Sequence, residues 1–236
     1  MNYLVLAAGM GTRLHPYTRN YPKSMLKLGN NKCALQNTID SIKKYDKTAQ
    51  ITTVVGFNQD IIKNSISGCK FVENPFFKDT NSIASLWFAK ELLDDDITII
   101  NADVVFEDSL WQKIITTDFE AFVCIDSSIK QDGDYNVQVI DDNVILMSKE
   151  LKDYFGEYAG ITKLNKKNAQ ILKQEIIEMV KDGFYNEWYE NAVVQTILDN
   201  KMSVKYLDIQ EYNWAELDTI NDLFLARQMT KTQGEE

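Results

Sequence analysis

The chain alternates between short apolar runs and longer segments in which apolar residues recur at helical spacing. Its first apolar run, Leu4 to Ala8, leads directly into a glycine-rich loop, which is typical of a buried parallel strand that enters a ligand-binding turn. Further short buried strands are predicted at residues 51–55, 71–73, 97–100 and 121–125. Amphipathic helices are predicted at residues 35–45, 60–66, 82–93 and 108–115. This alternation predicts an α/β fold with a mostly parallel sheet and helices on both faces.

The pattern changes after residue 136. Residues 137–146 predict a β-hairpin, because two segments with alternating apolar residues flank Asp141-Asp142-Asn143. Helices are then predicted at 166–181, 188–200 and 219–229, with a strand at 203–209. We therefore predict a single domain over residues 1–236, with halves at 1–130 and 131–229 and a polar, frayed tail at 230–236.

Composition narrows the class of protein. The formal net charge of -10 argues against a general nucleic-acid surface. No apolar run approaches the roughly 20 residues that a membrane helix needs, and no basic-then-apolar leader precedes the first strand. Cys33, Cys69 and Cys124 show no metal-ligand spacing and have apolar neighbours, which predicts core thiols. We expect a cytoplasmic protein that neither binds nucleic acid nor inserts into a membrane.

The loop after the first strand is basic although the chain is acidic. Arg13 and Lys23 lie in a stretch that contains no acid before Asp40. Gly9 and Gly11 carry no side chain at the carboxyl end of the strand, so backbone N–H groups can approach a phosphate closely. The third glycine and the downstream acid of a dinucleotide-binding turn are missing, and so is the Gly-Lys-Ser/Thr of a P-loop. We therefore expect a loop that binds phosphates in another way.

Residues 9–23 form the motif G-x-G-x-R-L-x-P-x-T-x-x-x-P-K. This motif resembles the signature of the nucleotidyltransferases that activate sugar 1-phosphates and small alcohol phosphates with a nucleoside triphosphate. The resemblance implies a Rossmann-like nucleotidyltransferase fold with a mostly parallel mixed sheet flanked by helices. It assigns residues 1–130 to the nucleotide and 131–229 to the acceptor. It also assigns catalysis to Arg13, which contacts the outer phosphates, and to Lys23, which lies near the α-phosphate.

Acidic residues at two places predict a metal site. Asp103 follows the apolar strand at 97–100, and the carboxyl ends of strands are where α/β sheets bind ligands. Glu216 and Asp218 alternate with apolar residues, so both face one side of an extended segment. Oxygen ligands suit Mg²⁺, and the resemblance assigns Asp103 and Asp218 to Mg²⁺ with Glu216 as a third ligand or an outer partner. Asp218 could also be the N-cap of the helix expected from residue 219, and both roles are compatible.

The segment at 74–87 departs from the sugar enzymes of the family. Where these carry a glutamine followed by Gly-Thr-Ala, this chain has N-P-F…T-N-S-I-x-S-L-W. This form resembles the branch typified by bacterial phosphocholine cytidylyltransferases, which implies CTP as the nucleotide. Asn81 and Ser82 would then read the edge of cytosine, although Thr80, Asn81 or Ser82 could also cap the helix that follows. The nucleotide-binding residues that the resemblance implies are Leu6, Ala7, Ala8, Gly9, Gly11, Thr12, Arg13, Lys23, Asn81, Ser82, Ser85 and Ala102.

Aromatic and acidic residues in the second half are the candidates for acceptor binding. The resemblance implies that Glu157, Tyr158, Trp188, Tyr189 and Glu190 bind the acceptor. Aromatic faces beside a carboxylate are typical of an ammonium site, so phosphocholine is the expected acceptor. Phosphoethanolamine, 2-aminoethylphosphonate and phosphoglutamine are alternatives, and the same aromatic residues could instead belong to the core.

The expected reaction is a Mg²⁺-assisted, in-line transfer of CMP from CTP to the phosphate of the acceptor, with release of pyrophosphate. The resembling branch serves capsule or cell-surface polysaccharide biosynthesis. Two other functions stay open: a sugar-1-phosphate nucleotidyltransferase and a non-catalytic nucleotide-binding homologue. Arg13, Lys23, Asp103 and Asp218 together argue against the second. The oligomeric state is also open, with a homodimer among the options.

Overall fold

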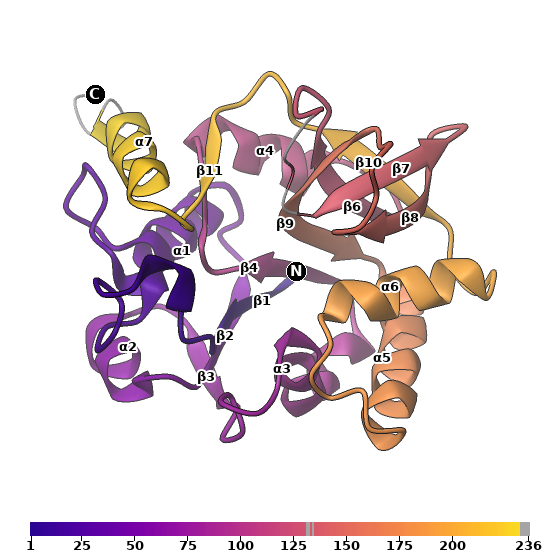
Figure 1. Cartoon of the computed structure of the whole chain (residues 1–236), viewed down its shortest axis with the longest axis horizontal. Helices are drawn as coiled ribbons and strands as arrows, with labels where there is room; N and C mark the ends of the chain where they lie inside the picture. Colours follow the sequence, from indigo (N-terminus) through magenta and orange to yellow (C-terminus); the bar gives the residue numbers. More distant parts are fainter. Residues whose placement is uncertain (131–132, 134, 232–236) are drawn as a thin grey trace.

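The computed structural model describes residues 1–130, 133 and 135–231, which form a mixed sheet with helices on both faces and a small two-stranded sheet beside it (Figure 1). The strand order in the main sheet is β3-β2-β1-β4-β9-β6-β10-β8-β7, and β5 pairs with β11. The expected α/β architecture with a mixed, helix-flanked sheet is confirmed. The strands are β1 (Asn2–Ala7), β2 (Gln50–Val55), β3 (Lys70–Glu73), β4 (Ile97–Asn101), β5 (Val104–Phe106), β6 (Ala121–Asp126), β7 (Asn136–Ile140), β8 (Asn143–Ser148), β9 (Gly156–Leu164), β10 (Val204–Asp208) and β11 (Trp214–Glu216).

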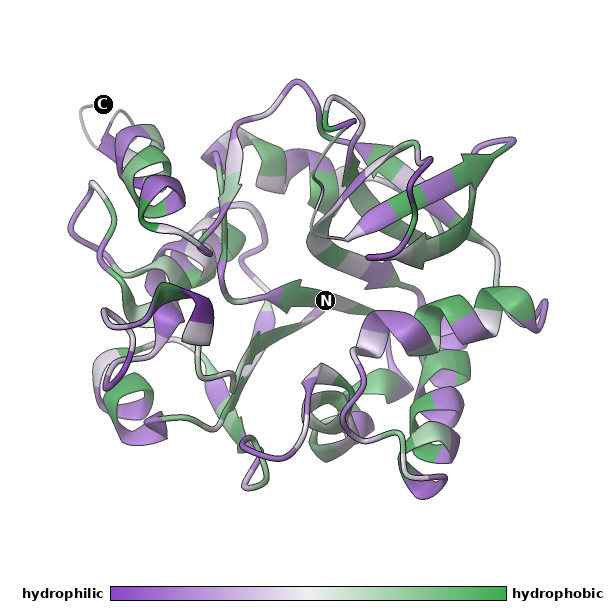
Figure 2. Ribbon diagram, in the orientation of Figure 1, coloured by the Kyte–Doolittle hydropathy of each residue, from purple (hydrophilic) through white to green (hydrophobic). Residues whose placement is uncertain are grey.

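Both faces of the parallel strands are buried, which explains their nearly continuous apolar sequences. Leu4 of β1 packs in a core with α3, α5 and α6, whereas its neighbours Tyr3 and Val5 pack on the opposite face with α1, α2 and α4. Figure 2 shows β1 and β4 apolar along most of their length. The helices are α1 (Ala34–Tyr45), α2 (Gln59–Ser65), α3 (Ser82–Phe88), α4 (Asp108–Thr116), α5 (Lys166–Lys181), α6 (Tyr189–Leu198) and α7 (Ile220–Lys231). Within the described residues, no helix is both long and apolar enough to cross a membrane.

Strand β9 lies in the middle of the sheet and was not predicted. It runs antiparallel to both β4 and β6, and all of its residues are buried. Two glycines and two charged residues interrupt its apolar pattern, so the sequence does not resemble a central strand. The buried ammonium of Lys163 is satisfied by the carbonyl groups of Ile114, Ile115 and Thr117 at the end of α4.

Three smaller expectations differ from the structure. The helix expected at 82–93 is divided, because α3 ends at Phe88 and a 3₁₀ turn follows at Lys90–Asp94. The tail does not fray from residue 230, since Thr230 is buried in α7 and its hydroxyl accepts the N–H of Gly29 at 2.8 Å. Residues 232–236 lie outside the described residues. Of the expected core thiols, Cys124 is buried, whereas Cys33 and Cys69 are half-buried.

Candidate active site

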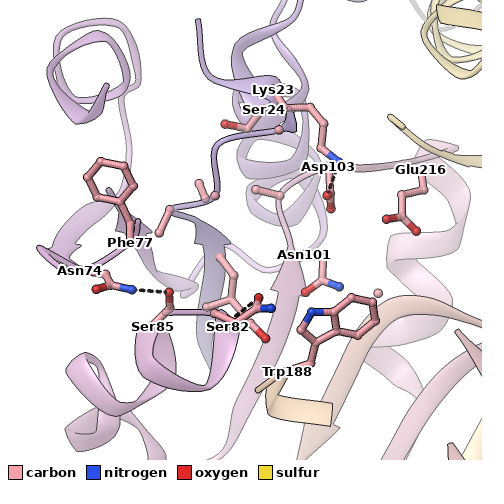
Figure 3. Close-up of a pocket in the computed structure, with 18 of the residues that line it drawn as sticks. Lys23, Ser24, Asn74, Phe77, Ser82, Ser85, Asn101, Asp103, Trp188 and Glu216 are labelled. Atoms are coloured by element: carbon pink, nitrogen blue, oxygen red, sulfur yellow. Dashed lines mark hydrogen bonds and ion pairs between the residues drawn. The ribbon is translucent and has the colours of Figure 1, made fainter. Parts of the chain in front are cut away.

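A pocket of about 300 Å³ opens at the carboxyl ends of β1 and β4, beside the first turns of α3 and α6 (Figure 3). All the residues predicted to bind the nucleotide line this pocket, together with Asp103, Glu216, Tyr158, Trp188 and Glu190. Sequence reasoning missed Ser24, Asn74, Phe77, Thr80, Asn101, Tyr135 and Gly160. Asn74, Phe77 and Thr80 lie within the segment at 74–87, and Ser24 and Asn101 adjoin Lys23 and a predicted strand end, which was a usable signal, whereas nothing local marks Tyr135.

The glycine loop presents its backbone to the pocket. A Cβ atom on Gly9 would meet no atom within 4 Å, so the space beside this residue is open. Gly11 has a φ of +60°, and a Cβ atom there would lie 2.9 Å from Cβ of Lys23. The hydroxyl of Thr18 donates to the carbonyl of Gly11 at 2.6 Å, which closes the loop on itself. The loop therefore leaves room for an anion at the end of β1, and glycine lets Lys23 lie against its turn.

Lys23 and Arg13 face the acidic residues across the pocket. Nζ of Lys23 lies 2.7 Å from Oδ2 of Asp103 and 2.7 Å from Oδ1 of Asp218. Nη1 of Arg13 lies 2.6 Å from Oδ2 of Asp218, and its Nη2 lies 3.5 Å from Oε1 of Glu216. Burial acts to lower the pKa of Lys23, but the carboxylates of Asp103 and Asp218 outweigh it and raise that pKa above the ordinary value. Lys23 is therefore cationic at neutral pH.

Asp103, Glu216 and Asp218 form one carboxylate cluster although two distant segments supply them. One carboxylate oxygen from each of the three residues lies within 4.8 Å of the other two. Glu216 ends β11, which pairs antiparallel with β5, and the N–H of Leu217 donates to the carbonyl of Asp103 at 2.9 Å. This donor set consists only of oxygen atoms, which is the set that Mg²⁺ prefers. The residues that the sequence predicts for a metal thus lie together.

The alternative role of Asp218 as a helix cap is wrong. The N–H of Asp222 donates to Oγ1 of Thr219 at 3.2 Å, and the N–H of Thr219 donates to Oδ2 of Asp222 at 2.6 Å. This reciprocal pair caps α7, which begins at Ile220. Both carboxylate oxygens of Asp218 instead face the cations Arg13 and Lys23.

The first turn of α3 carries the residues expected to read the base. Oδ1 of Asn81 accepts the N–H of Ser82 at 2.8 Å, so Asn81 is the N-cap of α3. Oγ of Ser82 accepts the N–H of Tyr189 at 2.9 Å, which joins α3 to α6. Ser85 lines the same wall one turn later. Capping is therefore a role of Asn81, while its amide N–H donors make no hydrogen bond within the described residues and can serve a ligand.

The other end of the pocket holds a buried carboxylate among aromatic rings. Glu190 is 4% exposed and receives a hydrogen bond from Nδ2 of Asn101 at 3.5 Å. Burial raises the pKa of Glu190 to about 7, the Asn101 hydrogen bond acting weakly in the opposite direction. The rings of Trp188 and Tyr135 lie 5.2 Å apart, and the ammonium of Lys149 lies 3.7 Å from the centre of the Trp188 ring. Trp188 therefore already contacts one cation of the protein.

Two residues predicted for the acceptor do not line the pocket. Tyr158 faces the pocket, so its neighbour Glu157 on β9 points to the opposite side of the strand. Tyr189 is fully buried, and its hydroxyl contacts the hydroxyls of Tyr158 and Thr162. Tyr189 thus contacts Tyr158 from the core side, away from the pocket.

Comparison with known proteins identifies the family. The model of the nucleotidyl transferase family matches residues 2–123, which is more than half of the chain. The chain belongs to this family. As a nucleotidyltransferase it is an enzyme, and its α/β nucleotidyltransferase fold agrees with the expectation from the sequence. The signature at residues 9–23 lies within the matched part.

Relatives of this nucleotidyltransferase cover it to different extents. CTP:phosphoglutamine cytidylyltransferase of Campylobacter jejuni is 27% identical and aligns with 94% of this chain and 98% of its own length. A bifunctional protein GlmU of Methanococcus maripaludis is 33% identical over 73% of this chain, which spans only 42% of that protein. The solved CTP:phosphocholine cytidylyltransferase of Streptococcus pneumoniae superposes with a TM-score of 0.79 at 22% identity, covering 98% of this chain and 99% of the other. That last likeness is one of fold.

Proposed function

We propose that this nucleotidyltransferase transfers CMP from CTP to the phosphate of a small phosphorylated acceptor and releases pyrophosphate. One observation carries the proposal: a single pocket holds the glycine loop with two cations, then the carboxylate cluster, then a buried glutamate among aromatic rings. This order matches a triphosphate, a reacting phosphate and a cationic head group. The full-length relative of Campylobacter jejuni, named for CTP and phosphoglutamine, supports the nucleotide and the type of acceptor.

The glycine loop and its cations would bind the triphosphate. The open space at Gly9 gives backbone N–H groups access to phosphate oxygens. Arg13 is half-exposed at the pocket rim and suits the outer phosphates, whereas Lys23 is only 11% exposed and lies deeper. Lys23 would therefore offset the negative charge that develops on the α-phosphate in the transition state. A phosphate acceptor is already ionised at pH 7, so the site needs no general base.

The carboxylate cluster fits Mg²⁺, and we propose Asp103, Asp218 and Glu216 as its holders. When bound there, Mg²⁺ would neutralise negative charge on the reacting phosphates. In the described structure Lys23 and Arg13 balance the same carboxylates. These two side chains are long and flexible enough to follow the phosphates when a substrate enters.

Glu190 would bind a cationic head group of the acceptor. A positive charge beside this carboxylate favours its ionised form and lowers its raised pKa, so the head group and the carboxylate stabilise each other. Trp188, Tyr135 and Tyr158 supply aromatic walls. Phosphocholine is the first candidate acceptor. Phosphoglutamine is the second, because its amino-acid head carries an ammonium for Glu190 and a carboxylate that suits the neighbouring charge of Lys149.

Pyrophosphate release tests the proposal directly. CTP, UTP, GTP and dTTP are each combined with phosphocholine, phosphoethanolamine, 2-aminoethylphosphonate, phosphoglutamine and glucose 1-phosphate, with and without Mg²⁺. We expect turnover with CTP, Mg²⁺ and an acceptor that carries an ammonium. Preference for UTP or dTTP with glucose 1-phosphate would contradict the proposal and support a sugar nucleotidyltransferase.

A further inference from the structure

A buried group of polar side chains forms part of the pocket wall away from the carboxylate cluster (Figure 3). Asn74 follows β3 and is 2% exposed, and Ser85 of α3 is 4% exposed. Both line the pocket, and Asn74 donates to Oγ of Ser85 at 3.2 Å. None of the contacts described above gives Asn74 a role, yet a buried amide in a substrate pocket determines which way neighbouring hydroxyl groups can point.

The backbone fixes the orientation of the Asn74 amide. The N–H of Phe76 donates to Oδ1 of Asn74 at 3.0 Å, and only an oxygen atom can accept it. The nitrogen atom Nδ2 must therefore face the two hydroxyl groups. It donates to Oγ1 of Thr80 and to Oγ of Ser85, each at 3.2 Å. No exchange of the amide oxygen and nitrogen is compatible with all three hydrogen bonds.

This orientation sets the polarity of the two hydroxyl groups. Thr80 accepts from Asn74 and sends its own proton to the carbonyl of Phe76 at 2.8 Å. Ser85 also accepts from Asn74, so its proton must point elsewhere. Among the residues that the structure describes, Ser85 Oγ has no other hydrogen-bond partner. The Ser85 hydroxyl is therefore held as a donor at the wall of the pocket.

We propose that Asn74 sets the nucleotide preference by holding the Ser85 hydroxyl as a donor to N3 of cytosine. N3 of cytosine is an acceptor, whereas N3 of uracil and thymine carries a proton. Uracil N3–H could at most use the second lone pair of the Ser85 oxygen, and the Ser85 proton would then have no acceptor in a buried site, which penalises UTP and dTTP. Asn74 acts through Ser85 and is a positioning residue. This assignment rests on CTP as the proposed nucleotide.

Asn74→Asp tests the assignment because it keeps the shape of the side chain and replaces the hydrogen-bond donor Nδ2 by an oxygen atom that can only accept when ionised. A carboxylate oxygen replaces Nδ2 and accepts the Ser85 proton, so that Oγ of Ser85 faces the pocket as an acceptor suited to uracil N3–H. The assays are run at pH 8, well above the ordinary pKa of an aspartate, to favour the ionised carboxylate, which the N–H of Phe76 also stabilises. We expect the ratio of kcat/KM for CTP to that for UTP to fall by roughly a hundredfold, with CTP weakened and UTP improved.

Three further variants separate a positioning role of Asn74 from a general defect. Ser85→Ala removes the donor and should lower kcat/KM for CTP about tenfold while leaving UTP little changed. The double variant of Asn74→Asp and Ser85→Ala should have the CTP-to-UTP ratio of Ser85→Ala alone, because Asn74 acts only through Ser85. Asn168→Asp adds the same charge at another buried asparagine, on α5 and outside the pocket, and should leave the ratio unchanged. Thermal shifts with CTP and with UTP provide a binding measurement that does not depend on turnover.

The following results would overturn the role assigned to Asn74 or the proposal on which it rests. Equal loss of CTP and UTP activity in Asn74→Asp would mean that Ser85 does not face N3. Loss of UTP activity with a gain for CTP would place the hydroxyl at the 4-position of the base. If Asn74→Asp does not fold, Ser85→Ala decides, since an unchanged CTP-to-UTP ratio would exclude Ser85 as the discriminating group. A wild-type enzyme that prefers UTP would instead overturn the proposed function itself, before any variant is compared.

Discussion

Replacing Glu190 by glutamine should stabilise the enzyme at alkaline pH and weaken its acceptor binding. The variant removes the charge but keeps the shape and an oxygen that can accept from Asn101. The pKa of Glu190 is raised from 4.5 to about 7. Since one pKa unit corresponds to about 1.4 kcal/mol, ionised Glu190 lowers the free energy of unfolding by about 3 kcal/mol above pH 7.

The direction of the pH dependence follows from proton counting. Between pH 4.5 and about 7 the folded protein keeps the proton of Glu190 while the unfolded chain has lost it. The unfolded chain therefore binds fewer protons, and the stability of the wild type falls as pH rises through this window. Glutamine does not titrate, so the variant lacks this loss. All other titrating groups are shared, and the difference between the two proteins isolates Glu190.

Denaturant unfolding at pH 5, 6, 7 and 8 measures this difference. We expect the two proteins to have similar stability at pH 5 and the variant to exceed the wild type by about 3 kcal/mol at pH 8, or roughly 6–12 °C in Tm. In the same preparations the KM for an ammonium-bearing acceptor should rise about tenfold while the KM for CTP stays unchanged.

A matched control is Glu175→Gln, which changes a buried glutamate of α5 that pairs with Lys201 at 2.9 Å outside the pocket. Its acceptor KM should equal that of the wild type. A stability difference for Glu190→Gln that does not vary with pH would refute the desolvated state of this carboxylate. An unchanged acceptor KM would refute its role in binding the head group.

Other predictions address the remaining parts of the pocket. Lys23→Ala should lower kcat by roughly 100- to 1,000-fold with CTP binding retained, because its charge acts mainly in the transition state; an unchanged kcat in steady-state assays would contradict this role. Asp218→Asn should abolish Mg²⁺-dependent turnover with little change in Tm. Asp222→Asn weakens the hydrogen bonds that the Asp222 carboxylate accepts from the N–H groups of Asp218 and Thr219 at the start of α7, and it should lower the free energy of unfolding by about 1 kcal/mol with turnover retained. Trp188→Ala should raise the acceptor KM several-fold without changing the KM for CTP, and equal weakening of both substrates would indicate a core role instead.

The parts of the fold that sequence reasoning predicted well depend on local pattern. Helix α5 has the predicted bounds because its apolar residues recur at helical spacing and Asn165 caps it. The pocket residues of the glycine loop were predictable for a related reason, since the motif at residues 9–23 fixes many residue types in one continuous stretch. The features that failed depend on distant contacts. Strand β9 tolerates Lys163 only because the end of α4 supplies three carbonyl groups.

The acceptor side shows why helix and strand phase limits prediction from sequence. Trp188 and Glu190 line the pocket, but Tyr189 between them points into the core. Which of three adjacent residues faces the ligand depends on the rotation of α6, which its packing against α3 and α5 sets. Whether Asp218 caps α7 likewise could not be decided from the sequence, because it depends on the hydrogen bonds that Thr219 and Asp222 exchange.

The pairing of β11 with β5 determines when the site becomes complete during folding. Asp103 is synthesised long before Leu217, whose N–H donates to the carbonyl of Asp103. Helix α7 is held against the first half of the chain by the hydrogen bond from Gly29 to Thr230. A chain that ends before β11 retains β1 and β4, whose ends line the pocket, but lacks Glu216 and Asp218. We therefore expect turnover to require the last segment of the chain to return across the molecule and pair with β5, since two of the three carboxylates come from it.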